Sequence, residues 1–175
     1  MRRSSFLDTP PKLTGEIRRF CAAVAAAEPL FIKLVPFPGC EADSVANLPG
    51  QCARFGGTAV DGWRVVVWPR VLIQAERHLI WHSPKDELID VTPAGGGAST
   101  LFLPDPEAGA KPGPIRHPLV RDANLARWIA LAAEGREMAP EALRAFADVV
   151  RAHAKPTDPC HCGSGRQMRR CHPVK

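Results

Sequence analysis

The chain has 175 residues, of which 45% are hydrophobic and 23% charged, and its formal net charge is +5. This composition is typical of a globular protein and excludes a disordered one, and the length suits one domain, or one domain with a small module. No apolar run approaches the ~20 residues that a membrane span needs, and the basic N-terminus lacks the apolar stretch of a secretion signal, so we expect a cytoplasmic protein without a membrane span.

Two helices are predicted in the N-terminal third of the chain. Residues 13–27 carry apolar side chains at helical spacing and predict an amphipathic helix that ends before Pro29. Prolines and glycines then interrupt the chain, and a short helix is expected from about Asp43, its N-cap, to Leu48.

The strands are predicted between residues 62 and 103. Runs rich in β-branched and aromatic residues alternate there with turn residues, and they cover 63–68, 71–75, 77–82, 87–91 and 100–103. We expect an antiparallel meander of four to five strands with flanking helices, which is an α+β fold.

A helical hairpin is predicted after an exposed connection. Residues 104–118 contain five prolines and two glycines, whereas 119–134 and 139–154 have helical periodicity. The second helix starts near Pro140, and its apolar stripe is expected to consist of Leu143, Phe146, Val149 and Val150. The predicted domains are an α+β domain over 1–118, a helical hairpin over 119–155 and a tail over 156–175.

The tail has the ligand pattern of a metal site. It contains Cys-x-Cys, then eight residues, then Cys-His. Three thiolates and one imidazole complete a tetrahedral shell around Zn²⁺ and leave no open position for a substrate. The Gly163-Ser164-Gly165 turn allows the backbone to bend tightly around the metal, which supplies folding free energy that so short a segment cannot obtain from a core. The alternative is a thiol-rich tail without metal.

From Asp158 to His172 the chain closely resembles the SEC-C motif, the zinc-binding tail of the bacterial preprotein translocase ATPase, which also ends many otherwise unrelated bacterial proteins. The resemblance includes the ligand spacing and the Gly-Ser-Gly turn, and it implies that the Zn²⁺ ligands are Cys160, Cys162, Cys171 and His172. The chain departs from the motif where lysines and an aromatic residue are replaced by Arg166, Gln167 and Met168, and at Pro173, where a glycine is frequent. None of these positions is a ligand.

A closed zinc knuckle does no chemistry, and in the translocase it is similar to a docking handle for a chaperone and for ribosomes. The resemblance therefore implies binding to a protein or ribosomal partner through Arg166, Arg169 and Arg170. The charge distribution agrees, because residues 151–175 hold six basic residues and one acidic residue, whereas the first 150 residues hold 17 of each. Nucleic acid is a second partner open to these arginines, and simple solvation of a short tail is the alternative to any partner.

The strand region carries a second resemblance. His78-Leu79-Ile80-Trp81, followed by Leu88-Ile89-Asp90-Val91-Thr92-Pro93, resembles the papain-like and transglutaminase-like cysteine hydrolases. In that pattern a nucleophilic Cys begins a helix, a His opens a strand with a Trp shortly after it, and an Asp follows on the next strand before Thr-Pro. The resemblance implies that His78 takes a proton from the nucleophile and that Asp90 orients the imidazole.

The reach from His78 to Asp90 depends on the turn between their strands. A turn of three residues (83–85) or five (82–86) pairs positions whose numbers sum to 168 and places the two side chains directly opposite each other. A turn of four residues (83–86) places them on opposite faces. The hydrolase hypothesis therefore needs an odd turn.

The nucleophile is the weakest part of this resemblance. Ser44-Val45-Ala46-Asn47-Leu48 aligns with the Cys-x-x-Asn-Val of related bacterial proteins, so Ser44 stands where the cysteine should be. Cys40 lies four residues earlier, at the start of the same expected helix, and Cys52 lies near its far end and is the least favoured of the three. Serine needs strong activation by a base, because its hydroxyl is far from ionised at neutral pH.

Two functions therefore remain open. The first is a zinc-binding protein whose tail docks to a partner, with a main domain of papain-like or transglutaminase-like fold. The second is an active cysteine or serine hydrolase that acts on an amide or peptide bond, with catalytic residues drawn from Ser44, Cys40, His78 and Asp90.

Overall fold

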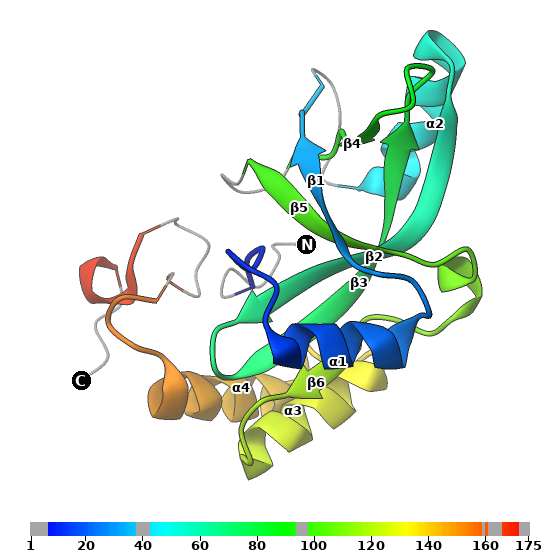
Figure 1. The fold of residues 1–175 in the computed structure, drawn as a ribbon. Coiled ribbons are helices and arrows are strands. Elements are labelled where there is room, and N and C mark those ends of the chain that lie inside the picture. The colour runs from blue at the N-terminus through cyan, green and yellow to red at the C-terminus, as the bar shows by residue number, and fades with distance from the viewer. Residues whose placement is uncertain (1–6, 38–42, 94–97, 159, 161–165, 172–175) are drawn as a thin grey trace. The chain divides into compact units, whose positions relative to one another are not determined.

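The structure, a computed structural model, describes residues 7–37, 43–93, 98–158, 160 and 166–171 (Figure 1). The chain divides into two compact units. The barrel unit consists of Thr9–Val66 and Ala75–Ile115, and the helical unit consists of Met1–Asp8, Val67–Gln74 and Arg116–Lys175.

Among the described residues, five strands close into a barrel. They are ordered β2-β5-β1-β4-β3, and β3 also pairs with β2, which closes the ring; β6 pairs with β3 outside it. Strand β1 pairs antiparallel with β5 and parallel with β4 (Figure 1). The strand bounds are β1 Leu30–Leu34, β2 Thr58–Trp68, β3 Leu72–His82, β4 Leu88–Asp90, β5 Ser99–Pro104 and β6 Ile115–Pro118.

The predicted α+β class is confirmed, but the predicted open antiparallel meander is wrong. Strand β1 enters between β4 and β5, so these two neighbours in sequence do not pair. No strand was predicted there, because prolines and glycines interrupt this part of the sequence. In addition, the predicted strands 71–75 and 77–82 are one strand, since Glu76 continues β3 and its carboxylate lies 3.4 Å from the Arg64 guanidinium of β2.

Two of the described helices begin where the sequence predicted. The helix bounds are α1 Gly15–Val24, α2 Ser44–Phe55, α3 Ala123–Ala133 and α4 Pro140–His153, with short 3₁₀ turns at Ala108–Ala110 and Met168–Arg170. The Asp43 carboxylate caps α2 by accepting a hydrogen bond from the Val45 N–H at 2.9 Å, and Pro140 occupies the first turn of α4. Within the described part of the chain, no helix has the length and apolar character needed to cross a membrane.

Two expectations about the helices are wrong. Helix α2 does not end at Leu48 but continues through Pro49 to Phe55, because Pro49 and Gly50 lie on its exposed side, where water can serve the carbonyl that a proline leaves unbonded. On α4, Leu143 is 46% exposed, and the small residues Ala142 and Ala145 are buried instead.

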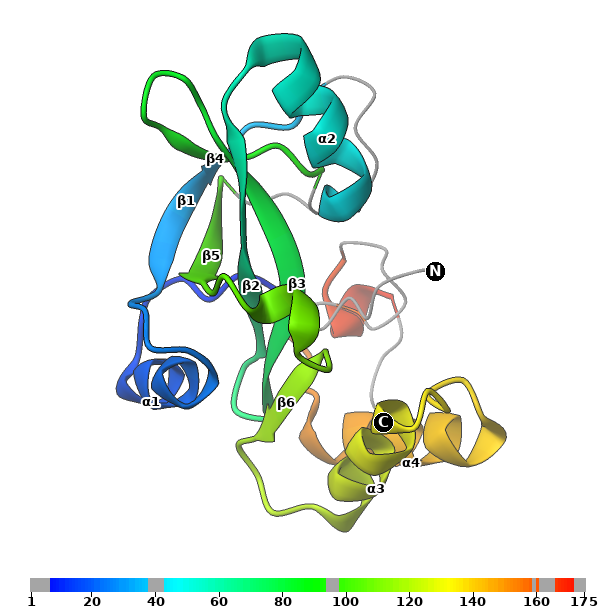
Figure 2. The same ribbon diagram turned by 90° about the vertical axis from the view of Figure 1, so that its right-hand side faces the viewer.

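The two faces of β3 and β4 have different surroundings in the barrel unit. Ile80 of β3 lies in the barrel interior with Ile32 and Phe102. On the other face, Trp81 and Val91 pack against Leu48 of α2, which covers the outside of these strands (Figure 2). Since side chains alternate between faces along a strand, His78 shares the face of Ile80 on β3, and Asp90 shares the face of Leu88 on β4, which packs on the same interior cluster.

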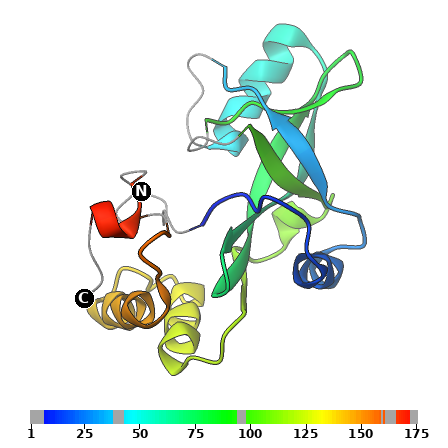
Figure 3. The same cartoon turned by 60° about the vertical axis from the view of Figure 1, so that its left-hand side comes forward.

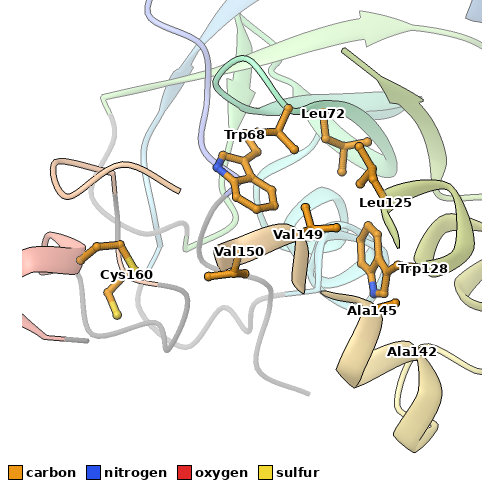
Figure 4. Packing of buried hydrophobic residues seen from close by; sticks show 11 residues of the cluster. Trp68, Leu72, Leu125, Trp128, Ala142, Ala145, Val149, Val150 and Cys160 are labelled. Carbon is orange, nitrogen blue, oxygen red and sulfur yellow. The ribbon is translucent and has the colours of Figure 1, made fainter. Parts of the chain in front are cut away.

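The helical unit has its own core. Helices α3 and α4 lie side by side (Figure 3). Trp68 and Leu72 at the end of the β2–β3 hairpin face Trp128 of α3 and Val149 of α4, all of them buried (Figure 4). The Arg116 guanidinium lies 4.9 Å from the Trp128 ring centre, so a cation covers one face of this core tryptophan.

The turn after α2 requires glycine. Gly57 has φ 81°, and a Cβ there would lie 2.2 Å from the His82 carbonyl oxygen and 2.8 Å from Nε1 of Trp81. The indole N–H of Trp81 donates to the Gly56 carbonyl at 2.9 Å. The turn therefore lies directly against the end of β3, where a side chain has no space.

We expect Gly57→Ala to lower the free energy of unfolding by more than about 2 kcal/mol, because it combines left-handed strain with a backbone clash. Gly50→Ala is the matched control, since nothing lies within 4 Å of its Cβ position and it sits inside a helix. The control should raise stability by about 0.5–1 kcal/mol. Urea unfolding of both variants measures the difference, and equal effects would contradict this account of the turn.

Candidate functional site

His78 and Asp90 form a buried pair. Nε2 of His78 lies 2.9 Å from Oδ2 of Asp90, and the two side chains are 2% and 0% exposed. Strand β3 supplies the histidine and the last residue of β4 supplies the aspartate. Both lie on the face of their strands that points into the barrel interior, with Ile80 and Leu88.

The turn between the two strands is odd, as the pairing requires, but it is shifted by one position. His82 pairs with Leu88, so the turn is 83–87 and paired numbers sum to 170, not 168. His78 and Asp90 therefore share a face as diagonal neighbours, and the expectation that they lie directly opposite is wrong. Ser83 accounts for the position of the turn, because its hydroxyl accepts hydrogen bonds from the Lys85 and Glu87 N–H groups at 3.2 Å.

The Asp90 carboxylate accepts two further hydrogen bonds. The Thr100 hydroxyl donates to Oδ2 at 2.6 Å, and the Thr92 N–H donates to Oδ1 at 2.9 Å. Burial by itself raises the pKa of Asp90, but the hydrogen bond and charge of His78 and the bonds from Thr100 and Thr92 together hold this pKa below its ordinary value. The site thus keeps an ionised carboxylate beside the imidazole.

Ser44 lies close to this pair without bonding the ring. It is the first residue of α2 and is 3% exposed, and its Oγ accepts a hydrogen bond from the Leu79 N–H at 3.0 Å. Leu79 directly follows His78, so the hydroxyl lies beside the main chain of the histidine. Among the hydrogen bonds of the described residues, none joins Ser44 Oγ to the His78 imidazole.

The cysteines of the barrel unit contribute little to this site. Cys40 lies outside the described residues. Cys52 packs in the cluster around Leu48 and Trp81 on the outside of the barrel. Cys21 is fully buried in α1, and burial, followed by the charge of Glu28, raises the pKa of its thiol to about 11, which makes it a poor nucleophile.

The described part of the tail is folded. The Cys160 N–H donates to the Arg166 carbonyl at 2.7 Å, and the Met168 N–H donates to the Asp158 carbonyl at 2.9 Å. Cys160 is fully buried in the core of the helical unit, and Cys171 packs against the same core. The first and third predicted ligands therefore belong to one folded segment.

Two of the four predicted zinc ligands, Cys160 and Cys171, lie among the described residues of the tail. The other two, Cys162 and His172, lie outside the described residues, and the described residues contain no group of three or more potential ligands. Thiolates and imidazole are the ligands that zinc prefers. We therefore retain the predicted set, with Cys160 and Cys171 as its described members.

Sequence reasoning missed two parts of the site. Thr100 was assigned only to a strand, and Leu79 was treated only as a strand residue. Thr100 reaches Asp90 inside the barrel although β1 lies between their strands, and no spacing in the sequence indicates this. Comparisons with protein family models, curated proteins and solved structures give no match for this chain.

We expect Asp90→Asn to lower the free energy of unfolding by about 3 kcal/mol at pH 7, because it breaks a buried, hydrogen-bonded pair. The folded-state pKa lies below the unfolded value of about 3.9, so the ionised carboxylate stabilises the wild type above that pH and this contribution is lost as the pH falls through the folded-state pKa. The difference between wild type and variant should therefore shrink below about pH 4.

Urea unfolding between pH 3 and pH 7 measures this difference. Asp148→Asn on the surface of α4 is the control, and it should change stability by no more than about 0.5 kcal/mol. A constant difference between wild type and Asp90→Asn across this pH range would contradict the role given to the carboxylate.

Proposed function

We propose that this protein is a zinc-binding docking protein, in which Zn²⁺ is held by Cys160, Cys162, Cys171 and His172 and a protein or ribosomal partner binds beside the metal. The observation that carries the proposal is the burial of Cys160 in the described part of the tail, where its N–H donates to the Arg166 carbonyl at 2.7 Å. A closed set of four ligands acts as a structural crosslink and gives the tail a defined surface.

The arginines of the tail support the proposed contact face. Arg166, Arg169 and Arg170 are exposed, whereas Met168 between them is 2% exposed and belongs to the core. Anchoring of Met168 therefore turns the neighbouring arginines outward. Such a cluster suits an acidic protein surface, and it equally suits the phosphates of nucleic acid on a ribosome.

The barrel unit supports binding rather than turnover. In the papain-like and transglutaminase-like pattern, the nucleophile position holds a cysteine that the histidine deprotonates. Here that position holds Ser44, and its hydroxyl accepts a backbone hydrogen bond from Leu79. Both Ser44 and His78 are at most 3% exposed, which leaves little of either group open to a substrate.

We expect wild-type protein to carry one Zn²⁺ per chain and the Cys171→Ser variant to lose it, because a structural site does not tolerate the loss of one of four ligands. Metal analysis after gel filtration measures the content, and co-sedimentation with ribosomes measures docking in the same samples. Cys52→Ser is the control, since Cys52 packs in the barrel unit. Full zinc retention in Cys171→Ser would reject the ligand set.

A second candidate function rests on the His78–Asp90 pair. Because Nε2 of His78 faces Asp90, Nδ1 is the ring atom left to act as a base. In an acyl transfer, Ser44 Oγ would bond to the carbonyl carbon of an amide, its proton would pass to Nδ1, and the departing amine would take that proton as the C–N bond breaks. Water would then release the acyl group by the same steps.

If this second candidate holds, a fluorophosphonate probe labels wild-type protein at Ser44, and both Ser44→Ala and His78→Gln abolish labelling. Mass spectrometry of the labelled peptide makes the assignment. Iodoacetamide at neutral pH tests the alternative nucleophile, since an activated Cys40 reacts faster than a free thiol. Neither reagent should react unusually fast with a protein that only docks.

A further inference from the structure

The turn between β2 and β3 contains an arginine in a conformation that favours glycine. Arg70 has φ 70°, in the left-handed region that side chains with a Cβ rarely adopt. The Val71 N–H donates to the Trp68 carbonyl at 3.0 Å, which makes the turn tight. An arginine in such a place needs a contact that offsets the strain of its backbone.

The contact is with the start of the tail. Nη2 of Arg70 lies 3.0 Å from Oδ2 and 3.2 Å from Oδ1 of Asp158. The carboxylate side chain is 8% exposed, while the arginine side chain is 46% exposed, so the pair lies at the edge of the core. Both residues belong to the helical unit, although they are 88 positions apart in the chain.

Asp158 connects three segments of the helical unit. Its Oδ2 accepts a hydrogen bond from the Lys155 N–H just after α4, and its carbonyl accepts one from Met168 in the second half of the tail, both at 2.9 Å. Through Arg70 it also reaches the β2–β3 turn. Cys160, the first zinc ligand proposed above, follows two residues later.

Apolar contacts reinforce this attachment. Cys160 and Met168 are 0% and 2% exposed and belong to the same core cluster as Trp68 and Val71, which flank Arg70 in the turn. The tail therefore packs on the residues around the arginine. A zinc module on a free tether would have no such contacts with the hairpin.

We infer that Arg70 is a positioning residue for the zinc site: by holding Asp158 it fixes the backbone that presents Cys160, and so links metal binding to the stability of the helical unit. This inference rests on the proposed function, since it requires a metal in the tail. Groups that orient metal ligands from outside the coordination shell commonly change metal affinity by ten- to a hundredfold. Metal binding and the stability of the helical unit are linked because a metal that binds only the folded tail also stabilises the core on which the tail packs.

Titration with Co²⁺ in place of zinc tests the inference, because thiolate-bound cobalt absorbs light and reports affinity without any activity. Arg70→Ala should weaken cobalt binding about tenfold and reduce the rise in melting temperature that the metal causes. Arg70→Gly is the second variant, since glycine relieves the left-handed strain but also removes the guanidinium. It should weaken cobalt binding as much as Arg70→Ala while the metal-free protein melts no lower than wild type.

Arg151→Ala is the matched control, because Arg151 pairs with Asp148 on the surface of α4. Its cobalt affinity should equal that of the wild type. Wild-type affinity in both Arg70 variants would overturn the positioning role and leave the zinc site standing. Failure of the wild-type protein itself to bind cobalt would overturn the proposed zinc site, and the role of Arg70 with it.

Discussion

Burial of the Asp90 carboxylate is the constraint on which the barrel unit depends. A charged group inside a barrel is tolerated only where hydrogen-bond donors replace the water that it loses. The donors come from different parts of the chain: His78 from β3, Thr100 from β5 and Thr92 from the segment after β4. In the closed barrel these donors meet at one point in the interior. The same fold that closes the sheet therefore also supplies the Asp90 carboxylate with its hydrogen bonds.

The His78–Asp90 pair is open to two roles, one structural and one catalytic. A buried carboxylate that orients an imidazole is half of a hydrolase triad, and it also serves as a structural crosslink between strands. The first residue of α2 decides between these roles. With Ser44 bonded to the Leu79 N–H, the hydroxyl contributes to the seating of the helix on the barrel unit. In the proposed docking function, the His78–Asp90 pair therefore acts as part of the fold.

The tail is integrated into the helical unit rather than appended to it. Asp158 bonds Arg70 of the β2–β3 turn, and Cys160 and Met168 complete the core around Trp68. Because Met168 is anchored, the exposed Arg169 and Arg170 beside it have a defined orientation. A partner that binds these arginines thus meets a surface whose shape depends on the tail's folding, and in the proposed function that folding depends on the metal.

The sequence by itself determined the Asp43 cap, the start of α4 at Pro140 and the α+β class. These depend on residues a few positions apart, whose backbone preferences act alone. Only the tertiary structure decided that β1 separates β4 from β5, that Thr100 bonds Asp90 and that Arg70 holds Asp158. Such contacts join distant segments, and their partners are chosen by the packing of the whole unit rather than by any short pattern.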